Sequence, residues 1–145
     1  MSAIFIDTNV LVYASSAASQ FHRSAANALA RCEDTGDVLC VSRQVLREYL
    51  ATVTRPQAGV SPLDGAAATA EARRLVEIYA MLEDGETVTD RLLNLFVQYP
   101  VGGKQIHDAN IVATMLAHGI PKLLTHNVAD FNRFAARITV IPLVP

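Results

Sequence analysis

Cysteine is scarce in this sequence, with two residues among 145. Cys32 and Cys40 lack the CxxC spacing of a metal-binding pair, and two cysteines are too few for a disulfide framework. We therefore expect both side chains to be reduced thiols in a cytoplasmic protein.

Long apolar runs and a secretory leader are also missing. Charged residues interrupt every long segment, so no run reaches the length of a membrane-spanning helix. The first ten residues, MSAIFIDTNV, have no basic stretch at their start, and Asp7 cuts their apolar run. The sequence predicts neither a signal peptide nor contact with a membrane.

Neither sign of charge is in large excess, because 12 basic and 14 acidic residues give a formal net charge of −2. This composition does not by itself indicate a nucleic-acid partner, although a local basic face can exist at any net charge. Hydrophobic residues, by contrast, make up 51% of the chain, and the mean hydropathy is +0.26. These values exclude a disordered chain and predict one domain over residues 1–145.

Short apolar stretches alternate with helical patterns along the chain. Such strands, apolar on both faces and separated by helices, are typical of an α/β domain with a mostly parallel central sheet flanked by helices. We expect a helical turn and loop at 8–16 and a short strand at 86–89. The remaining strands are expected at 3–7, 37–42, 122–125 and 138–143, and the helices at 22–32, 43–54, 66–83, 90–99, 106–119 and 127–136.

A carboxylate interrupts the first apolar segment. Asp7 follows the strand pattern AIFI, and apolar residues resume at Val10. An unpaired charge is costly to bury, but ligands of parallel α/β sheets bind just outside the carboxyl ends of the strands. We therefore expect Asp7 at the edge of a crevice, together with Thr125 at the end of another strand.

Three further acids have comparable positions. Asp108 lies in the first turn of a predicted helix, in line with Val112 and Met115, while Glu48 borders the apolar stripe of its helix and Asp130 lies early in the helix at 127–136. Carboxylates that converge at one edge of a sheet repel each other, and a hard divalent cation such as Mg²⁺ or Mn²⁺ removes that repulsion. Such ions can align a water for phosphodiester hydrolysis.

Four motifs occur in a characteristic order: FIDTNVLVYA at 5–14, SRQVLREYL at 42–50, IHDANIVATMLAHG at 106–119 and LLTHNVADFNRF at 123–134. In this combination the chain resembles the PIN-domain nucleases, and in particular the VapC-type toxins of bacterial toxin–antitoxin pairs. The resemblance spans the whole chain. It implies a PIN-like, Rossmann-like three-layer fold and a metal-dependent endoribonuclease that acts as the toxin of a type II pair.

The resemblance also implies roles for individual residues. The first three acids of the family, here Asp7, Glu48 and Asp108, bind Mg²⁺ or Mn²⁺ and position the water. The fourth acidic position is less regular in the family, and Asp130 takes that role here in preference to Asn127. The residues expected to support the site are Thr8, Asn9, Thr125 and Asn127.

Partners follow from the same resemblance. A VapB-like antitoxin is expected to block the acidic crevice with a C-terminal segment. The helices at 66–83 and 90–99 carry more apolar residues than one buried face needs, which predicts a homodimer. Four basic residues are either solvated surface or contacts for RNA phosphates or the acidic tail of the antitoxin: Arg43, Arg47, Lys104 and Arg133.

Other interpretations remain open. Asp7 and Asp108 could each serve as ordinary acids at helix starts, and Glu48 as a solvated helix residue. The alternative function is a catalytically inactive PIN-like module that binds RNA or protein, which Asn127 in place of an acid favours. A haloacid-dehalogenase-type phosphatase is set aside, because its second aspartate would stand where this chain has Asn9.

Overall fold

The computed structural model describes residues 2–57 and 59–144, and within them five short strands form a parallel sheet. The sheet order is β3-β2-β1-β4-β5, and each neighbouring pair is parallel. This arrangement confirms the predicted fold class. The strands are β1 (Ala3–Ile6), β2 (Val38–Ser42), β3 (Ala80–Leu82), β4 (Lys122–Leu124) and β5 (Thr139–Ile141).

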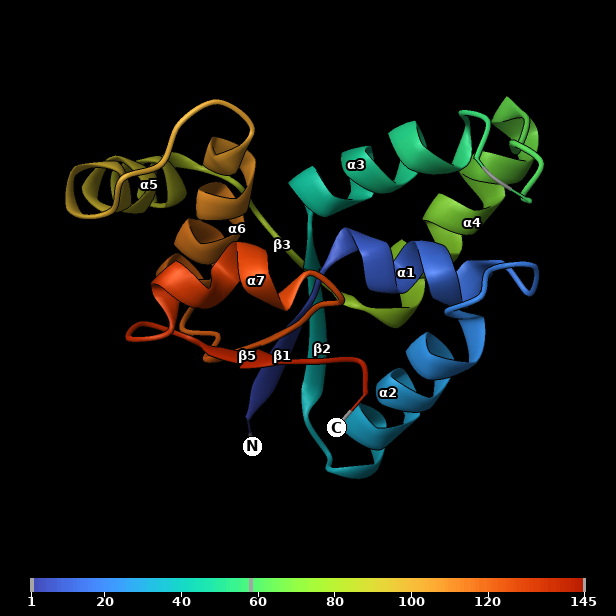
Figure 1. Cartoon of the computed structure of the whole chain (residues 1–145), viewed down its shortest axis with the longest axis horizontal. Coiled ribbons are helices and arrows are strands. Elements are labelled where there is room, and N and C mark those ends of the chain that lie inside the picture. Colours follow the sequence, from blue (N-terminus) through green and yellow to red (C-terminus); the bar gives the residue numbers. More distant parts are fainter. Residues whose placement is uncertain (1, 58, 145) are drawn as a thin grey trace.

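Helices cover both faces of the sheet. Figure 1 shows α1 to α4 on one side of the strands and α5 to α7 on the other, which gives three layers. The helices are α1 (Thr8–Ser15), α2 (His22–Asp34), α3 (Arg43–Val53), α4 (Gly65–Ile78), α5 (Glu86–Gln98), α6 (Gln105–His118) and α7 (Val128–Phe131), and a 3₁₀ turn follows at Asn132–Phe134.

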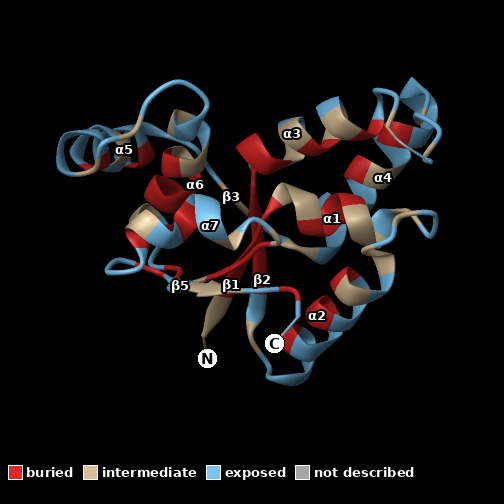
Figure 2. Ribbon diagram, in the orientation of Figure 1, coloured by how far each residue is buried: buried red, intermediate tan, exposed pale blue. Residues whose placement is uncertain are grey.

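The central strand β1 forms the middle of the hydrophobic core. Phe5 and Ile6 point to opposite faces and are both fully buried, as expected for a strand covered by helices on two sides. Figure 2 shows buried residues concentrated along β1 and β2 and on the helix faces turned toward them. The continuous apolar run at the start of the chain is therefore explained by burial on both faces.

The register of the sheet brings two segments together at its carboxyl edge. β1 lies in the middle of the sheet. The chain adds β2 and β3 on one side of β1 and then returns to add β4 and β5 on the other side. The Asp7 amide donates to the Leu124 carbonyl at 3.0 Å, and the Thr125 amide donates to the Ile141 carbonyl at 3.1 Å. Asp7 and Thr125 therefore follow adjacent strands, at the kind of switch point where parallel sheets bind ligands.

Side-chain caps fix where the helices near this edge begin. Asp7 caps α1, with its Oδ1 accepting from the Thr8 amide at 2.8 Å. Ser42 caps α3 and accepts from the Val45 amide at 3.3 Å, as the sequence predicts. At the other end of α6, Gly119 has a φ of 69° and closes the helix in the left-handed conformation.

The predicted helix at 66–83 is wrong in its last part. The structure ends α4 at Ile78 and places the edge strand β3 at Ala80–Leu82. Tyr79 makes the change with an extended backbone, and no glycine or proline marks it in the sequence. A three-residue apolar strand fits a helical pattern equally well, and its pairing with β2 decides the outcome.

Two other local predictions are corrected. The segment at 86–89 is the first turn of α5 and not a strand. Gly85 stands at the N-cap of this helix, and Val88 is buried in the core despite the β-branched residues of the segment. The segment at 8–16 forms a complete helix, α1, whose Val10, Leu11 and Val12 are buried. In both segments tertiary packing overrides local propensity.

Two composition-based expectations concern the cysteines and the membrane. Cys32 and Cys40 are both buried and free, which agrees with the expected thiols. Among the described residues, none of the helices has the length and apolar character needed to cross a bilayer.

Candidate active site

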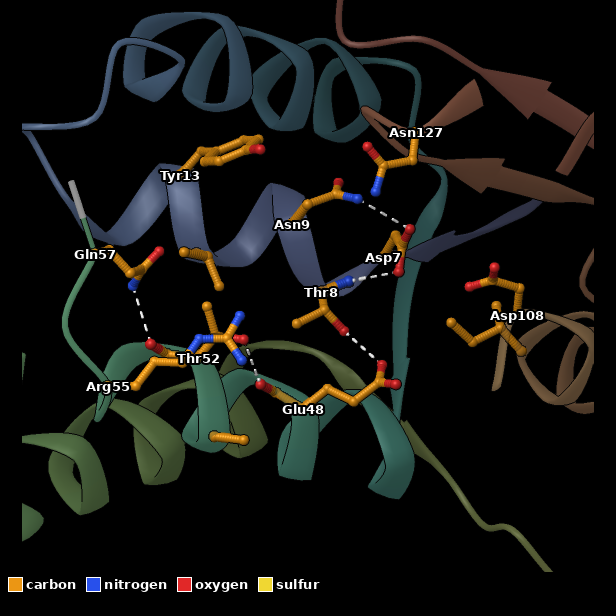
Figure 3. A pocket seen from close by; sticks show the side chains of 13 residues that line it. Asp7, Thr8, Asn9, Tyr13, Glu48, Thr52, Arg55, Gln57, Asp108 and Asn127 are labelled. Atoms are coloured by element: carbon orange, nitrogen blue, oxygen red, sulfur yellow. Dashed lines mark hydrogen bonds between the residues drawn. The ribbon is translucent and has the colours of Figure 1, made fainter. Parts of the chain in front are cut away.

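An open cavity of about 450 Å³ lies at the carboxyl edge of the sheet. It brings together Asp7 at the end of β1, Glu48 of α3 and Asp108 of α6, whose side chains converge in Figure 3. The other residues of its wall are Thr8, Asn9, Val12, Tyr13, Ala51, Thr52, Arg55, Gln57, Ile111 and Asn127. Three of the four predicted acids thus share one cavity.

Asp7 is the most buried acid of the cavity, with 6% of its surface exposed. Burial raises its pKa and the charge of Glu48 raises it further, while hydrogen bonds act in the opposite direction. Those bonds come to Oδ2 from Thr125 Oγ1 at 2.7 Å and Asn9 Nδ2 at 3.1 Å, and to Oδ1 from the Thr8 amide. The expected buried acid therefore has partners on both oxygens.

Thr8 connects two of the acids. Its amide donates to Asp7, and its hydroxyl donates to Glu48 Oε1 at 2.9 Å. The helix α1 therefore holds the carboxylates of β1 and α3 in a fixed relation. Thr8 therefore bonds to both acids, an arrangement compatible with the positioning role that the sequence predicts for it.

Asp108 carries the clearest sign of crowded negative charge. Its pKa is raised from 3.8 to about 6, first by desolvation and then by the charges of Asp130, Asp7 and Glu48, while Arg133 acts in the opposite direction. Asp108 lies in the first turn of α6, as predicted, where the helix dipole favours a carboxylate. Desolvation and the neighbouring acids nevertheless raise its pKa.

A polar brace connects the helices that carry Glu48 and Asp108. Gln44 of α3 is buried, and its Nε2 donates to the His107 carbonyl at 2.8 Å. Asn110 of α6 donates to Gln44 Oε1 at 2.7 Å. Because His107 and Asn110 flank Asp108 along α6, this brace sets the spacing between the two acids.

Asn9 and Asn127 complete the polar wall around Asp7. Asn9 donates to Asp7 and accepts from the His126 amide at 3.0 Å. The Asn127 amide donates to Thr125 Oγ1 at 3.0 Å, so the threonine hydroxyl stands between Asn127 and Asp7. All the predicted supporting residues therefore lie in or next to the cavity.

Asp130 lies outside the cavity wall, but its charge raises the pKa of Asp108 more than the charge of Asp7 or Glu48 does. It is exposed on α7 and does not belong to the cavity wall, whereas Asn127 does. Its charge nevertheless acts on Asp108, since it is among the causes of the raised pKa of that residue. The structure thus places the predicted fourth acid outside the cavity but within electrostatic range of it.

The four predicted basic contacts lie outside the cavity wall as well. Arg43 forms a surface ion pair with Glu83 at 2.7 Å, and Arg133 donates to the Pro100 carbonyl at 3.1 Å. Arg47 and Lys104 are exposed. The basic residue that does reach the cavity is Arg55, which the sequence analysis missed.

Sequence reasoning also missed Gln44, Asn110 and Tyr13. Arg55 lies just beyond the end of α3, and its spacing of seven residues from Glu48, two helical turns, was the one available signal. Gln44 lies one turn before Glu48 on the same helix face, which was a comparable signal. Tyr13 and Asn110 gave none, because their roles depend on contacts between distant segments.

The donor chemistry of the cavity suits a hard divalent cation. Carboxylate oxygens are the ligands that Mg²⁺ and Mn²⁺ prefer. The pKa of Asp108 is raised first by desolvation and then by neighbouring acids, whose negative charge a cation would neutralise. Among residues 2–57 and 59–144, no three acidic, histidine or cysteine side chains form a closed metal-binding group. By donor chemistry, the carboxylates of Asp7, Glu48 and Asp108 are the residues that would hold such an ion.

Comparison with known proteins identifies the class. Residues 4–137 match the PIN domain family, and the chain belongs to it. The resemblance to PIN-domain nucleases is thereby confirmed. A curated relative, Ribonuclease VapC24 of Mycobacterium tuberculosis, is 30% identical over 131 residues, which cover 89% of each chain.

Solved structures agree in fold. The VapC20 toxin of Mycobacterium tuberculosis, described as cleaving the sarcin–ricin loop, is 20% identical, with a TM-score of 0.67 over 94% of this chain and 97% of that one. A toxin–antitoxin complex from Klebsiella pneumoniae is 22% identical, with a TM-score of 0.69 over 98% of both chains. These similarities support the three-layer α/β architecture.

We expect Asp108→Asn to raise the melting temperature of the metal-free protein by about 2–4 °C near pH 7.5, equivalent to roughly 1 kcal/mol after allowing for solvent screening. An acid whose pKa rises on folding stabilises the protein at low pH and loses that contribution as the pH rises from 3.8 through about 6. The gain from the substitution should therefore disappear on acidification. Thermal unfolding across this pH range measures it.

Asp90→Asn is the matched control, because Asp90 is exposed on α5, away from the cavity. It removes the same charge and should leave the melting temperature nearly unchanged. A gain for Asp108→Asn that is the same at every pH would contradict the electrostatic explanation.

We expect Gln44→Ala to lower the free energy of unfolding by about 1–3 kcal/mol, because the His107 carbonyl and the Asn110 amide lose their buried partner. Gln20→Ala, at an exposed glutamine, is the control and should stay within about 0.5 kcal/mol of the wild type. Urea unfolding compares the two variants. Equal stability would show that the brace is dispensable.

Proposed function

We propose that this protein is a Mg²⁺- or Mn²⁺-dependent endoribonuclease and the toxin of a type II toxin–antitoxin pair, acting in the cytoplasm. The convergence of Asp7, Glu48 and Asp108 in one open cavity carries this proposal. Membership of the PIN domain family and the similarity to a protein named as a ribonuclease support it.

The chemistry follows from the acids and their surroundings. A divalent cation bound by Asp7, Glu48 and Asp108 would supply a positive charge that stabilises the negative charge of phosphodiester hydrolysis. Thr8, Asn9 and Thr125 hold Asp7 rigid by donating to its oxygens, which leaves its orientation independent of the substrate. Two side chains hold Glu48 in place: the Thr8 hydroxyl donates to Oε1 at 2.9 Å, and Gln44 Nε2 donates to Oε2 at 3.4 Å.

Arg55 extends the acidic centre with a positive charge. It lines the same cavity as the three acids, and its side chain reaches into the cavity in Figure 3. A guanidinium group binds phosphate oxygens well, so Arg55 is placed to contact an RNA phosphate beside the reacting one.

The proposed partner is a VapB-like antitoxin. The Klebsiella structure described above is a toxin–antitoxin complex, and this chain has the same fold as part of it. We propose that the antitoxin inhibits the protein by placing a C-terminal segment over the acidic cavity. A cationic or amide group on that segment would be attracted by the same carboxylates that attract a metal ion.

We expect Asp7→Asn, Glu48→Gln and Asp108→Asn each to lower the rate of RNA cleavage about a hundredfold or more, because each removes a charged ligand of the proposed cation. The exposed Asp130 lies outside the cavity wall, so Asp130→Asn should have a smaller effect. Cleavage of total RNA by purified protein, with Mg²⁺, Mn²⁺ or EDTA, measures these differences.

Asp90→Asn again serves as the control for loss of one negative charge and should retain full activity. Growth arrest on induced expression should follow the same order among the variants. Discrete cleavage that persists in EDTA would contradict the metal dependence. Intact RNA with wild type and variants alike would favour the inactive binding module instead.

We also propose a homodimer, which exposed apolar residues on α5 support. Figure 1 shows α4 and α5 at opposite ends of the molecule, so their apolar residues do not form one patch. On α5, the exposed fractions are 57% for Leu93, 51% for Phe96 and 86% for Val97. Exposed apolar side chains of this size on one helix are typical of a protein interface, so we propose that α5 forms the dimer contact.

We expect Phe96→Asp to convert a dimer into a monomer, because it places a charge within the proposed apolar contact. Thr87→Asp is the matched control, since it adds the same charge at an exposed site in the first turn of α5. Analytical ultracentrifugation distinguishes the two species. A Phe96→Asp protein that sediments like the wild type would rule out this surface.

A further inference from the structure

Three aromatic side chains meet beside the acidic cavity, from segments far apart in the sequence. Tyr13 belongs to α1, Phe21 precedes α2, and His126 follows β4. The ring centroids are 4.9 Å apart for Tyr13 and Phe21, 4.4 Å for Phe21 and His126, and 5.5 Å for Tyr13 and His126. We refer to these three residues as the aromatic cluster.

The aromatic cluster differs from the aromatic side chains of the core. Phe5, Phe131 and Phe134 are almost completely buried, whereas Tyr13, Phe21 and His126 keep part of their surface in solvent. Two of the three rings in the cluster also carry polar atoms. The cluster is therefore a partly open aromatic surface and not an extension of the hydrophobic core.

Tyr13 stands between two cavities. It lines the acidic cavity and also a second one of about 390 Å³, whose wall includes Phe21. Both cavities share Val12, Tyr13 and Gln57, so they lie next to each other at α1. A flat group entering from the acidic side would meet the Tyr13 ring.

The cluster is rigidly tied to the acidic centre. The His126 amide donates to Asn9, which in turn donates to Asp7. Tyr13 lies on the helix that Asp7 caps, and the pKa of its hydroxyl is raised by burial and then by the charge of Asp7. The position of the aromatic surface relative to the carboxylates is thus fixed by the fold.

Groups suited to a nucleotide surround Tyr13. Figure 3 shows Arg55 and Gln57 across the cavity from Tyr13. Gln57 donates through Nε2 to the Thr52 carbonyl at 2.9 Å, which leaves its amide oxygen as an acceptor for a base amino group. An aromatic face, a guanidinium and an amide are the groups with which proteins bind unstacked RNA bases and their phosphates.

An RNA strand would need a source of binding energy at this site that does not depend on charge. The three acids of the cavity repel the phosphates of an approaching strand, so electrostatic attraction there is weak. Base stacking on an aromatic ring does not depend on the charge of the phosphates. The aromatic cluster supplies this binding energy next to the acids.

We propose that the aromatic cluster is a nucleobase-binding subsite, in which a base of single-stranded RNA next to the cleaved phosphate stacks on Tyr13 while Arg55 contacts the backbone. This inference rests on the proposed ribonuclease function. It adds a residue set that holds the substrate without taking part in the chemistry.

The test compares Tyr13→Leu, which keeps apolar bulk but removes the ring, with Tyr13→Phe, which keeps the ring. Binding of a fluorescent single-stranded RNA oligonucleotide is measured in EDTA by anisotropy, with the intact strand and with strands in which one nucleotide at a time is abasic. We expect Tyr13→Leu to weaken binding about tenfold and Tyr13→Phe to retain it. One abasic position should weaken binding to the wild type but not to Tyr13→Leu.

Cleavage kinetics with metal give an independent readout. Tyr13→Leu should raise KM about tenfold and leave kcat nearly unchanged, whereas Asp108→Asn lowers kcat. RNA binding that depends on Tyr13 in a protein that cleaves nothing would support the subsite while refuting the nuclease. Binding of all strands equally by the wild type and Tyr13→Leu, or an effect of Tyr13 on antitoxin binding alone, would overturn the subsite.

Discussion

The rest of this structure depends on the burial of the Asp7 carboxylate at the end of β1. A charge removed from water in this way must be satisfied locally, and three donors do so: the Thr8 amide, Asn9 and Thr125. Each donor also has a structural role of its own. The amide starts α1, the asparagine holds the segment after β4 through the His126 amide, and the threonine ends β4 itself. One carboxylate therefore organises the carboxyl edge of the sheet at its switch point.

The remaining acids make that edge electrostatically unfavourable. Asp108 cannot be brought near Asp7 and Glu48 without a rise in its pKa, and the metal-free fold is less stable at neutral pH as a result. The Gln44–Asn110 brace and the Thr8–Glu48 hydrogen bond hold α3, α6 and α1 together against this repulsion. Hydrogen bonds between helices thus offset the charge repulsion that the proposed metal site brings with it. A protein selected for stability alone would not keep three carboxylates in one cavity.

The sequence predicted those parts of the molecule that follow local rules. A buried strand that ends in an acid placed Asp7 at the sheet edge, and the motif order located Glu48 and Asp108. What sequence could not predict depends on contacts between distant segments. β3 is a strand because it pairs with β2, and Tyr13 is part of an aromatic surface because His126 and Phe21 fold against it. Asp130 satisfied the motif but lies outside the cavity wall, since a position along the chain does not give the direction of a side chain.

The proposed function needs two properties that one group of side chains cannot supply: binding of a metal ion and binding of an RNA strand. The acidic cavity suits the first and the aromatic cluster the second. The acids suit a metal ion and the reacting phosphate, yet they repel the rest of an RNA strand, whose every nucleotide carries a charge. Stacking on Tyr13 acts on the uncharged part of the nucleotide, and Arg55 acts on the charged part away from the acids. Asn9 joins the two regions by one pair of hydrogen bonds, so a base held on the ring has a defined position relative to Asp7. The aromatic surface would therefore position the substrate for the proposed hydrolysis without taking part in the chemistry.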